Sequence, residues 1–330
     1  MHRWSNLEDV PAGFGPSVVT IGNFDGVHRG HRTVLTAMVA AARARDVAAV
    51  AVTFDPHPAT VHRPDRAPDL ITGITDRLEL LEQTGLDGVL VVHYTAEFAR
   101  TSAEEFVTRY LVEGLGARTV VVGRDVRFGR DNAGDLTTMR ALGGEHGFDV
   151  DVVEDVHGEV EPGRRWSSTW VRELLEGGDV ESAARILGRP HRVRGVVVHG
   201  DARGRELGFP TANLGPEAVG QVPADGVYAG WMRRVDHPGT SPDGYLPVAI
   251  SIGTNPTFSG AHRRVEAHVP GRTDLELYGE EIVLELVARL RPTLRFDSVA
   301  ELIEQMHDDV ARTRAVLAEG PLRLGGSAAG

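Results

Sequence analysis

The chain has 330 residues, 41% of them hydrophobic and 25% charged, which is an ordinary composition for a globular protein of more than one domain. Its formal net charge of −12 argues against a broad nucleic-acid-binding surface, and its lack of cysteine excludes disulfides, thiolate metal sites and cysteine nucleophiles. It contains no apolar run of membrane-spanning length and no secretory signal at residues 1–13, so we expect a soluble cytoplasmic protein without nucleic-acid or membrane partners.

From residue 16 to about 153, apolar runs alternate with stretches of helical periodicity. The continuous runs are typical of buried parallel strands, and they cover residues 17–24, 47–54, 88–92, 117–123 and 149–153. Residues 31–45 and 102–115 instead repeat apolar side chains at helical spacing. This alternation predicts an α/β fold with an open parallel sheet, in which ligands bind at the carboxyl ends of the strands.

The segment "GNFDGVHRGH", residues 22–31, lies where the first buried strand passes into a helix. A helix N-terminus favours phosphate, and glycines allow the backbone to approach it closely. His28 and His31 are three residues apart on the first turn, so both can donate to a polyphosphate. Two other interpretations stay open at this point, namely a zinc-binding pair that lacks an obvious third ligand and two exposed histidines without a role.

A second candidate anion site lies in "RWSSTWVRELL", residues 165–175. Ser167, Ser168 and Thr169 stand at a predicted helix start, with Arg165 before it and Arg172 on its first turn. Hydroxyls, helix N–H groups and guanidinium groups together suit a phosphate. The alternative is an ordinary N-cap without further function.

After His191 the apolar residues alternate with period two between Gly, Pro and Asp turns, which predicts an antiparallel sheet closed into a small barrel. One long helix follows, with Ser298 and Glu301 as a capping box. Its predicted buried stripe consists of Val299, Leu302, Ile303, Met306, Val310 and Leu317. We therefore predict domains at 1–186 and 187–320, followed by a flexible tail at 321–330.

The third motif is "GRELGFPTANL", residues 204–214. Thr211 and Asn213 project to the same side of an extended segment, and their oxygens suit Mg²⁺. Glu266 lies opposite the apolar face of "RVEAHV" and could accept a proton from an alcohol that attacks ATP. The alternatives are a turn in which Thr and Asn bond the backbone and a solvated carboxylate. A Walker lysine motif is missing, which excludes an ordinary P-loop kinase.

"GNFDGVHRGH" and "SSTWVREL" resemble the HxGH and SSTxxR signatures of the nucleotidyltransferase superfamily. The resemblance implies a Rossmann-like domain whose histidines stabilise the pentacoordinate α-phosphate and the departing pyrophosphate. It assigns catalysis to His28, His31 and Arg172. It assigns ATP and phosphate contacts to Gly22, Asn23, Phe24, Asp25, Gly26, Gly30, Arg165, Ser168 and Thr169.

"TFDPHP", residues 53–58, and "VVVGRDVRFGRDNAGD", residues 120–135, are similar to the FMN adenylyltransferase module of prokaryotic bifunctional riboflavin kinase/FAD synthetases. The resemblance implies flavin contacts by Phe54, Pro56, His57, Pro58, Asp125, Arg127 and Phe128. Asp125 and Arg127 depart from the family pattern there, and Trp170 is larger than the residue expected within the SSTxxR signature.

The block from about 187 to 320 resembles the riboflavin kinase module, a six-stranded barrel. The resemblance implies that Thr211 and Asn213 bind Mg²⁺ and ATP, that Glu266 is the catalytic base, and that residues 200–210 form a mobile loop over the phosphates. Gly204, Gly208 and Pro210 belong to the same predicted ATP-binding segment.

The sequence thus predicts a bifunctional enzyme that phosphorylates riboflavin to FMN and adenylylates FMN to FAD, with ATP as co-substrate and Mg²⁺ as cofactor. Riboflavin, FMN and ATP are its expected ligands, and self-association is not predicted. Three rivals remain: an enzyme with one working activity, a flavin- or nucleotide-binding regulator without turnover, and a metal-dependent hydrolase that uses Asp25, His28 and His31.

Overall fold

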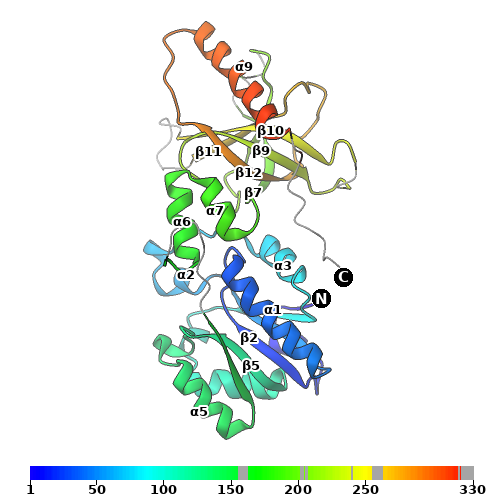
Figure 1. Ribbon diagram of the computed structural model, residues 1–330, viewed down its shortest axis with the longest axis vertical. Helices are drawn as coiled ribbons and strands as arrows, with labels where there is room; N and C mark the ends of the chain where they lie inside the picture. The colour runs from blue at the N-terminus through cyan, green and yellow to red at the C-terminus, as the bar shows by residue number, and fades with distance from the viewer. Residues whose placement is uncertain are drawn as a thin grey trace. The chain divides into compact units, whose positions relative to one another are not determined.

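The computed structural model describes residues 1–154, 163–200, 204, 207–238, 241–254, 263–318 and 320. The chain divides into two compact units, which are residues 1–68 with 74–166 and residues 69–73 with 167–330 (Figure 1). Among the helices in these described ranges, none is both long and apolar enough to cross a membrane.

The first unit is built on a six-stranded sheet, and all its strand pairs are parallel. Its order is β1-β4-β3-β2-β5-β6. The strands are β1 (His2–Trp4), β2 (Ser17–Ile21), β3 (Ala48–Asp55), β4 (Gly88–His93), β5 (Ala117–Gly123) and β6 (Asp149–Val153). The predicted parallel sheet is therefore confirmed, and it gains the edge strand β1.

Helices join these strands and cover both faces of the sheet. They are α1 (Arg29–Ala44), α2 (Pro58–His62), α3 (Ile74–Glu82), α4 (Ala103–Phe106), the π-helical turns η4 (Val107–Gly114) and α5 (Leu136–His146). Short 3₁₀ turns lie at η1 (Leu7–Asp9), η2 (Pro64–Arg66), η3 (Phe98–Arg100) and η5 (Arg130–Asn132). One apolar core packs α1 and α3 against the sheet, and a second packs η4 and α5.

The loop between β2 and α1 turns sharply at the carboxyl edge of the sheet. Its backbone is left-handed at Phe24 (φ 48°), Gly26 (φ 83°) and Val27 (φ 38°). A β-branched residue rarely adopts a positive φ, and such strained positions concentrate at ligand-binding sites. Both Phe24 and Val27 are buried, so apolar packing holds this unfavourable backbone in place.

The second unit contains two short helices and a closed barrel. The helices are α6 (Ser168–Gly177) and α7 (Val180–Leu187). The barrel order is β10-β11-β8-β7-β12-β9, with antiparallel pairs. Its strands are β7 (His191–Val198), β8 (Thr211–Leu214), β9 (Gly226–Arg234), β10 (Tyr245–Thr254), β11 (Arg263–His268) and β12 (Glu281–Arg291). The six-stranded barrel is as predicted.

The predicted domain boundary at 186/187 falls where helices give way to the barrel, since α7 ends at Leu187 and β7 begins at His191. The compact units divide earlier, after Trp166. The two divisions differ in where they assign α6 and α7. The predicted tail at 321–330 lies outside the described residues.

The long helix α9 (Val299–Val316) follows the barrel, as predicted. Ser298 caps it by accepting from the Glu301 N–H, while the Glu301 carboxylate accepts from the N–H of Asp297 rather than that of Ser298. The predicted stripe is only partly right, because Val299 is 60% exposed whereas Leu317 is buried.

A polar anchor, instead of a purely apolar stripe, fastens α9 to the barrel. Asp309 is 4% exposed and accepts from Arg291 of β12 at 2.9 Å (Nε to Oδ1) and 2.7 Å (Nη2 to Oδ2). Gln305 also donates to Asp309, at 3.1 Å. Burial of this carboxylate is tolerated because a two-point guanidinium partner matches its charge.

We predict that Asp309→Asn lowers the free energy of unfolding by about 3 kcal/mol, because Arg291 then loses its buried counter-charge. Urea-induced unfolding monitored by circular dichroism measures the change. Asp308→Asn is the matched control, since the Asp308 carboxylate is 56% exposed and lies 3.9 Å from Arg312. Equal stabilities of the two variants would contradict the anchor.

Candidate active sites

The paired histidines at the start of α1 are in direct contact. His28 is the N-cap residue, and its Nδ1 accepts a hydrogen bond from the His31 N–H at 3.2 Å. The two rings are stacked, with centroids 3.6 Å apart and an interplanar angle of 18°. Since Nδ1 of His28 is an acceptor, the proton of its neutral ring lies on Nε2. The expected pairing of the two imidazoles at a helix N-terminus is thus present.

His31 has surroundings that disfavour a positive charge. Burial lowers its pKa well below the ordinary value, and the adjacent His28 ring and the guanidinium groups of Arg77 and Arg165 lower it further. Phe24 contacts its ring edge-on, with centroids 5.4 Å apart. The Nδ1 atom of His31 is buried without a hydrogen-bond partner, so a neutral imidazole keeps one polar atom unsatisfied.

Two glycines in this motif make room for the rings. A Cβ at Gly30 would lie 3.1 Å from Cε1 and Nδ1 of His28, and one at Gly22 would lie 3.0 Å from the Phe24 ring. Any side chain at either position would therefore displace an aromatic ring. Asn23 bonds outward from the loop, since its carbonyl accepts from Thr53 Oγ1 at 3.1 Å and its amide lies 3.3 Å from Nε2 of His57.

The second motif forms the start of α6. Ser167 is its N-cap and accepts from the Trp170 N–H at 3.2 Å, while half-buried Ser168 and exposed Thr169 open the helix. Arg172 donates through Nε to the Asp69 carbonyl at 2.8 Å. The bulky Trp170 is 2% exposed and belongs to the core of the second unit.

Trp166 and Arg165, which precede Ser167, lie in the first unit beside the histidine loop. The Trp166 carbonyl is 3.6 Å from where a Gly30 Cβ would stand, and the guanidinium of Arg29 lies 5.1 Å from the centroid of the Trp166 ring. Arg165 forms an ion pair with Asp125 at 2.8 Å. Trp166, which lies against the histidine loop, therefore directly precedes Ser167, the first residue of the second motif.

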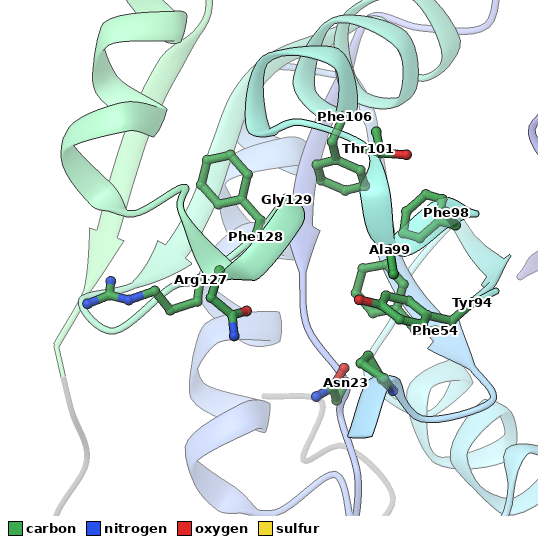
Figure 2. Close-up of a pocket in the computed structure, with 12 residues that line it drawn as sticks. Asn23, Phe54, Tyr94, Phe98, Ala99, Thr101, Phe106, Arg127, Phe128 and Gly129 are labelled. Carbon is green, nitrogen blue, oxygen red and sulfur yellow. The ribbon is translucent and has the colours of Figure 1, made fainter. Parts of the chain in front are cut away.

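An aromatic cavity opens at the carboxyl edge of the sheet. Asn23 of the histidine loop belongs to its lining, which connects the cavity to the first motif. Figure 2 shows the aromatic rings gathered around it, with the Arg127 guanidinium directed away from them. The rings in its wall come from Phe54, Tyr94, Phe98, Phe106 and Phe128.

The predicted flavin-contacting residues divide into two groups. Phe54, Pro58, Arg127 and Phe128 line the cavity. His57 instead caps α2, where its Nδ1 accepts from the Ala59 N–H at 3.1 Å. Pro56 follows the carboxyl end of β3, and Asp125 is engaged by Arg165.

Three aromatic wall residues were not predicted, namely Tyr94, Phe98 and Phe106. Tyr94 and Phe98 follow the carboxyl end of β4. Ligands commonly bind at the carboxyl ends of strands in a parallel sheet, so this position could have been considered. Phe106 lies in residues 102–115, for which the sequence predicted a helix but no ligand contact. Its neighbouring rings in the fold, such as Phe128 at 6.3 Å between centroids, come from distant parts of the chain.

The barrel brings the third motif together across two strands. In the β8–β11 pair, Asn213 lies opposite Glu266 and Thr211 lies opposite His268. Thr211 Oγ1 is 3.5 Å from Oε2 of Glu266, and Asn213 Nδ2 is 3.4 Å from Thr211 Oγ1. A hydroxyl, an amide and a carboxylate thus form one polar cluster, although Thr211 and Glu266 are 55 residues apart in the chain.

The segment before β8 folds back toward this cluster. Gly204 O accepts from the Phe209 N–H at 2.8 Å, Gly208 has a φ of 85°, and the Pro210 carbonyl lies 2.9 Å from Nδ1 of His268. Pro210 and Thr211 line a small cleft beside β8. The predicted mobile loop at 200–210 is only partly covered, since 201–203 and 205–206 lie outside the described residues.

The donor set in the barrel fits a hard divalent cation. Thr211 and Asn213 offer side-chain oxygens about the neighbouring Glu266 carboxylate, and hard cations such as Mg²⁺ prefer oxygen ligands and few protein groups. Within the part of the chain that the structure describes, three or more His, Asp or Glu side chains nowhere gather into a metal-binding group.

Two family models match the chain along most of its length. The model for FAD synthetase matches residues 12–169, which include the histidine motif, the aromatic cavity and the start of α6. The model for riboflavin kinase matches residues 187–317, which cover the barrel and α9.

The chain is also similar to individual proteins along most of its length. The chain is 37% identical over 297 residues to a bifunctional riboflavin kinase/FMN adenylyltransferase of Escherichia coli strain K12, a match covering 90% of this chain and 91% of that protein. It is 35% identical over 297 residues to the protein of that name in Bacillus subtilis strain 168, covering 89% and 90%. A solved structure, titled a macrolide-efflux protein from Streptococcus pneumoniae, superposes with a TM-score of 0.82 at 31% identity and covers 94% of this chain and 98% of that one.

The lowered pKa of His31 predicts a specific pH dependence of stability. Below the ordinary value of 6.5, the unfolded chain binds a proton at His31 that the folded chain does not, so stability falls as the pH falls. The slope contributed by this one proton is at most about 1.4 kcal/mol per pH unit.

Thermal unfolding of the wild type and of His31→Gln between about pH 7.5 and pH 5 measures this effect. We expect the variant to lose less stability than the wild type over that range. A parallel fall in the two proteins would show that His31 takes up its proton as readily in the folded chain as in the unfolded one.

Proposed function

Because the chain belongs to the family of bifunctional riboflavin kinase/FMN adenylyltransferases, we propose that it carries out these two reactions at two sites, one built on the parallel sheet and one in the barrel. It converts riboflavin and ATP to FMN, and then FMN and ATP to FAD with release of pyrophosphate. The assignment of individual residues to these steps follows from the chemistry of each cluster.

In the adenylyl transfer, a phosphate oxygen of FMN attacks the α-phosphorus of ATP. The new P–O bond forms as the bond from the α-phosphorus to the bridging oxygen breaks, and pyrophosphate leaves. His28 donates from Nε2–H and His31 donates from Nδ1–H, the ring atom left without a partner in the protein, to the oxygens on which charge develops. The helix α1 N–H groups add a positive field at the same point.

The stacking of the two imidazoles is the observation that best supports a role for His28 and His31 in adenylyl transfer. Two charged rings would repel each other at a centroid separation of 3.6 Å, so the geometry suits at least one neutral ring that donates and accepts hydrogen bonds. Fixed dipoles of this kind stabilise a transition state without having to reorganise during the reaction.

We assign phosphate binding in the first unit to Gly22, Asn23, Phe24, Asp25, Gly26, Gly30 and Arg165. At the start of α6 we assign it to Ser168 and Thr169, with Arg172 acting on the leaving pyrophosphate. Arg165 is supported by its position, since it lies near enough to His31 to lower the pKa of that ring. In the resting protein it is paired with Asp125, a partner that ATP phosphates replace on binding.

The flavin ring of FMN occupies the aromatic cavity. An isoalloxazine is flat and largely apolar, and rings such as Phe54, Phe98 and Phe128 offer it stacking and edge contacts. Pro56, His57, Pro58 and Arg127 belong to the segments that bound this cavity and hold its shape. Because Asn23 lines the cavity too, the flavin phosphate can lie toward the histidine loop.

In the kinase reaction, the 5′-hydroxyl oxygen of riboflavin attacks the γ-phosphorus of ATP. Glu266 takes the hydroxyl proton, the bond between the γ-phosphorus and its bridging oxygen breaks, and ADP leaves. Thr211 lies within 3.5 Å of the Glu266 carboxylate, so the base and the phosphate-binding hydroxyl act on the same group. Gly204, Gly208 and Pro210 shape the segment that lies over the phosphates.

Thr211 and Asn213 are the residues that would hold Mg²⁺ in the barrel. When bound there, the ion would neutralise part of the negative charge of the ATP phosphates. The protein's own contribution is to fix the two oxygen ligands by pairing β8 with β11.

Glu266→Gln tests the kinase site, because glutamine keeps the shape of the side chain but cannot accept the proton. We expect FMN formation from riboflavin to fall by at least about 100-fold, while FMN is converted to FAD at nearly the wild-type rate. Incubation with riboflavin or FMN, ATP and Mg²⁺, followed by chromatography of FMN and FAD over time, measures both. Equal loss of the two reactions would contradict separate sites.

The double variant His28→Ala/His31→Ala tests the adenylyl transfer site. Removal of both imidazoles takes away the groups that face the developing charge, so we expect FAD formation to fall by about 1,000-fold or more while riboflavin phosphorylation persists. The same chromatographic assay, with pyrophosphate release as a second readout, measures the loss. Retained FAD synthesis would remove the histidines from the mechanism.

A further inference from the structure

A fully buried arginine lies behind the histidine loop. Arg77, in α3, has 0% of its surface exposed and is among the largest completely buried side chains of the described chain. Arginine remains charged at neutral pH, and burial of a charge is costly unless it is matched. A side chain of this kind needs an explanation beyond apolar packing.

Few hydrogen bonds within the protein compensate its burial. Nη1 donates to the carbonyl of Phe54 at 2.9 Å, whereas Nε and Nη2 are buried without a hydrogen-bond partner. Burial lowers the pKa of Arg77, and the nearby carboxylates of Asp25 and Asp55 oppose that effect. The guanidinium is thus held by one hydrogen bond to the end of β3 and by attraction to the carboxylates of Asp25 and Asp55.

These partners belong to the two halves of the adenylyl transfer site. Asp25 lies in the loop before His28 and is itself 2% exposed, while Phe54 and Asp55 end β3, where the wall of the aromatic cavity begins. Arg77 also acts on His31, whose protonation it disfavours. One buried cation therefore touches or influences both the anion-binding loop and the flavin-facing strand end.

We propose that Arg77 is a positioning residue for adenylyl transfer, which fixes the histidine loop and the end of β3 relative to each other and supplies a constant positive charge behind the ATP phosphates. This inference rests on the adenylyl transfer function proposed for the site. An apolar residue could fill the same space, but it would remove the positive charge that attracts Asp25 and Asp55 and would place no positive potential behind the phosphates.

The charge state of His31 provides a readout that a purely structural role would not change. The groups that lower its pKa are His28 at the start of the same helix, Arg77 of α3 and Arg165 of the segment before α6. Loss of the Arg77 charge removes one of these three influences, so protonation of His31 becomes easier.

The experiment compares Arg77→Met, which removes the charge, with Arg77→Lys, which keeps it. In the full-length enzyme we expect Arg77→Met to lower kcat for FAD formation by about 100-fold with little change in KM for FMN, and Arg77→Lys to restore most of it. An NMR titration of the His31 ring should show a higher pKa in the methionine variant and an unchanged one in the lysine variant. Riboflavin phosphorylation should be unaffected in both.

Arg43→Met is the matched control, since Arg43 is 51% exposed and pairs with Asp87 near the C-terminal end of α1. It should leave FAD formation and the His31 titration unchanged. The proposal is overturned if Arg77→Lys fails as badly as Arg77→Met, or if the His31 titration is the same in both, since Arg77 then acts through packing alone. Retained FAD synthesis in the His28/His31 double variant would instead refute the adenylyl transfer site itself.

Discussion

The first site depends on one hydrogen bond, from the His31 N–H to Nδ1 of His28, at 3.2 Å. Most helices use a serine, threonine or aspartate oxygen at the N-cap, so a capping imidazole is an unusual choice. Here it places a ring at the position where helix N–H groups favour anions, and it brings the second ring into stacking contact. The cap, the ring pair and the burial of His31 are consequences of the same geometry. The strained backbone at Phe24 and Val27 lies in the loop that leads to the N-cap residue.

The two units differ in how deeply the charged side chains of their sites are buried. In the first unit, Arg77 and Asp25 are almost completely enclosed, so their mutual attraction is weakly screened, and the charge of Arg77 also reaches His31. In the barrel, Glu266 and Thr211 are only partly buried and lie beside a small cleft. A preorganised field suits a reaction between two phosphates, because both partners are already anions. A more open oxygen cluster suits a site that must admit an ion with its water.

Much of this architecture follows from the sequence, because periodicity reports burial directly. The apolar runs at 117–123 and 149–153 predicted buried parallel strands, and β5 and β6 occupy them, although β6 is an edge strand in which no residue is buried. The histidine pair was predictable because its spacing is local. Phe106 and Tyr94 were not, since only the folded sheet brings the segment after β4 beside α4. Asp309 was missed for a related reason: its partner Arg291 is 18 residues away, and a helix pattern cannot report a counter-charge on a strand.

The two clusters also differ in a way that the two reactions require. The nucleophile in adenylyl transfer is a phosphate oxygen that already carries charge, so it needs no base, and hydrogen-bonding imidazoles suffice. The nucleophile in riboflavin phosphorylation is an alcohol that must lose a proton, and this calls for a carboxylate at the reacting oxygen. On the proposed assignment, His28 and His31 stand in the first site and Glu266 in the second for this reason. An exchange of residue types would fail in both places: a carboxylate at the helix N-terminus would repel the triphosphate, and a neutral imidazole in the barrel would lack the negative charge of the carboxylate base.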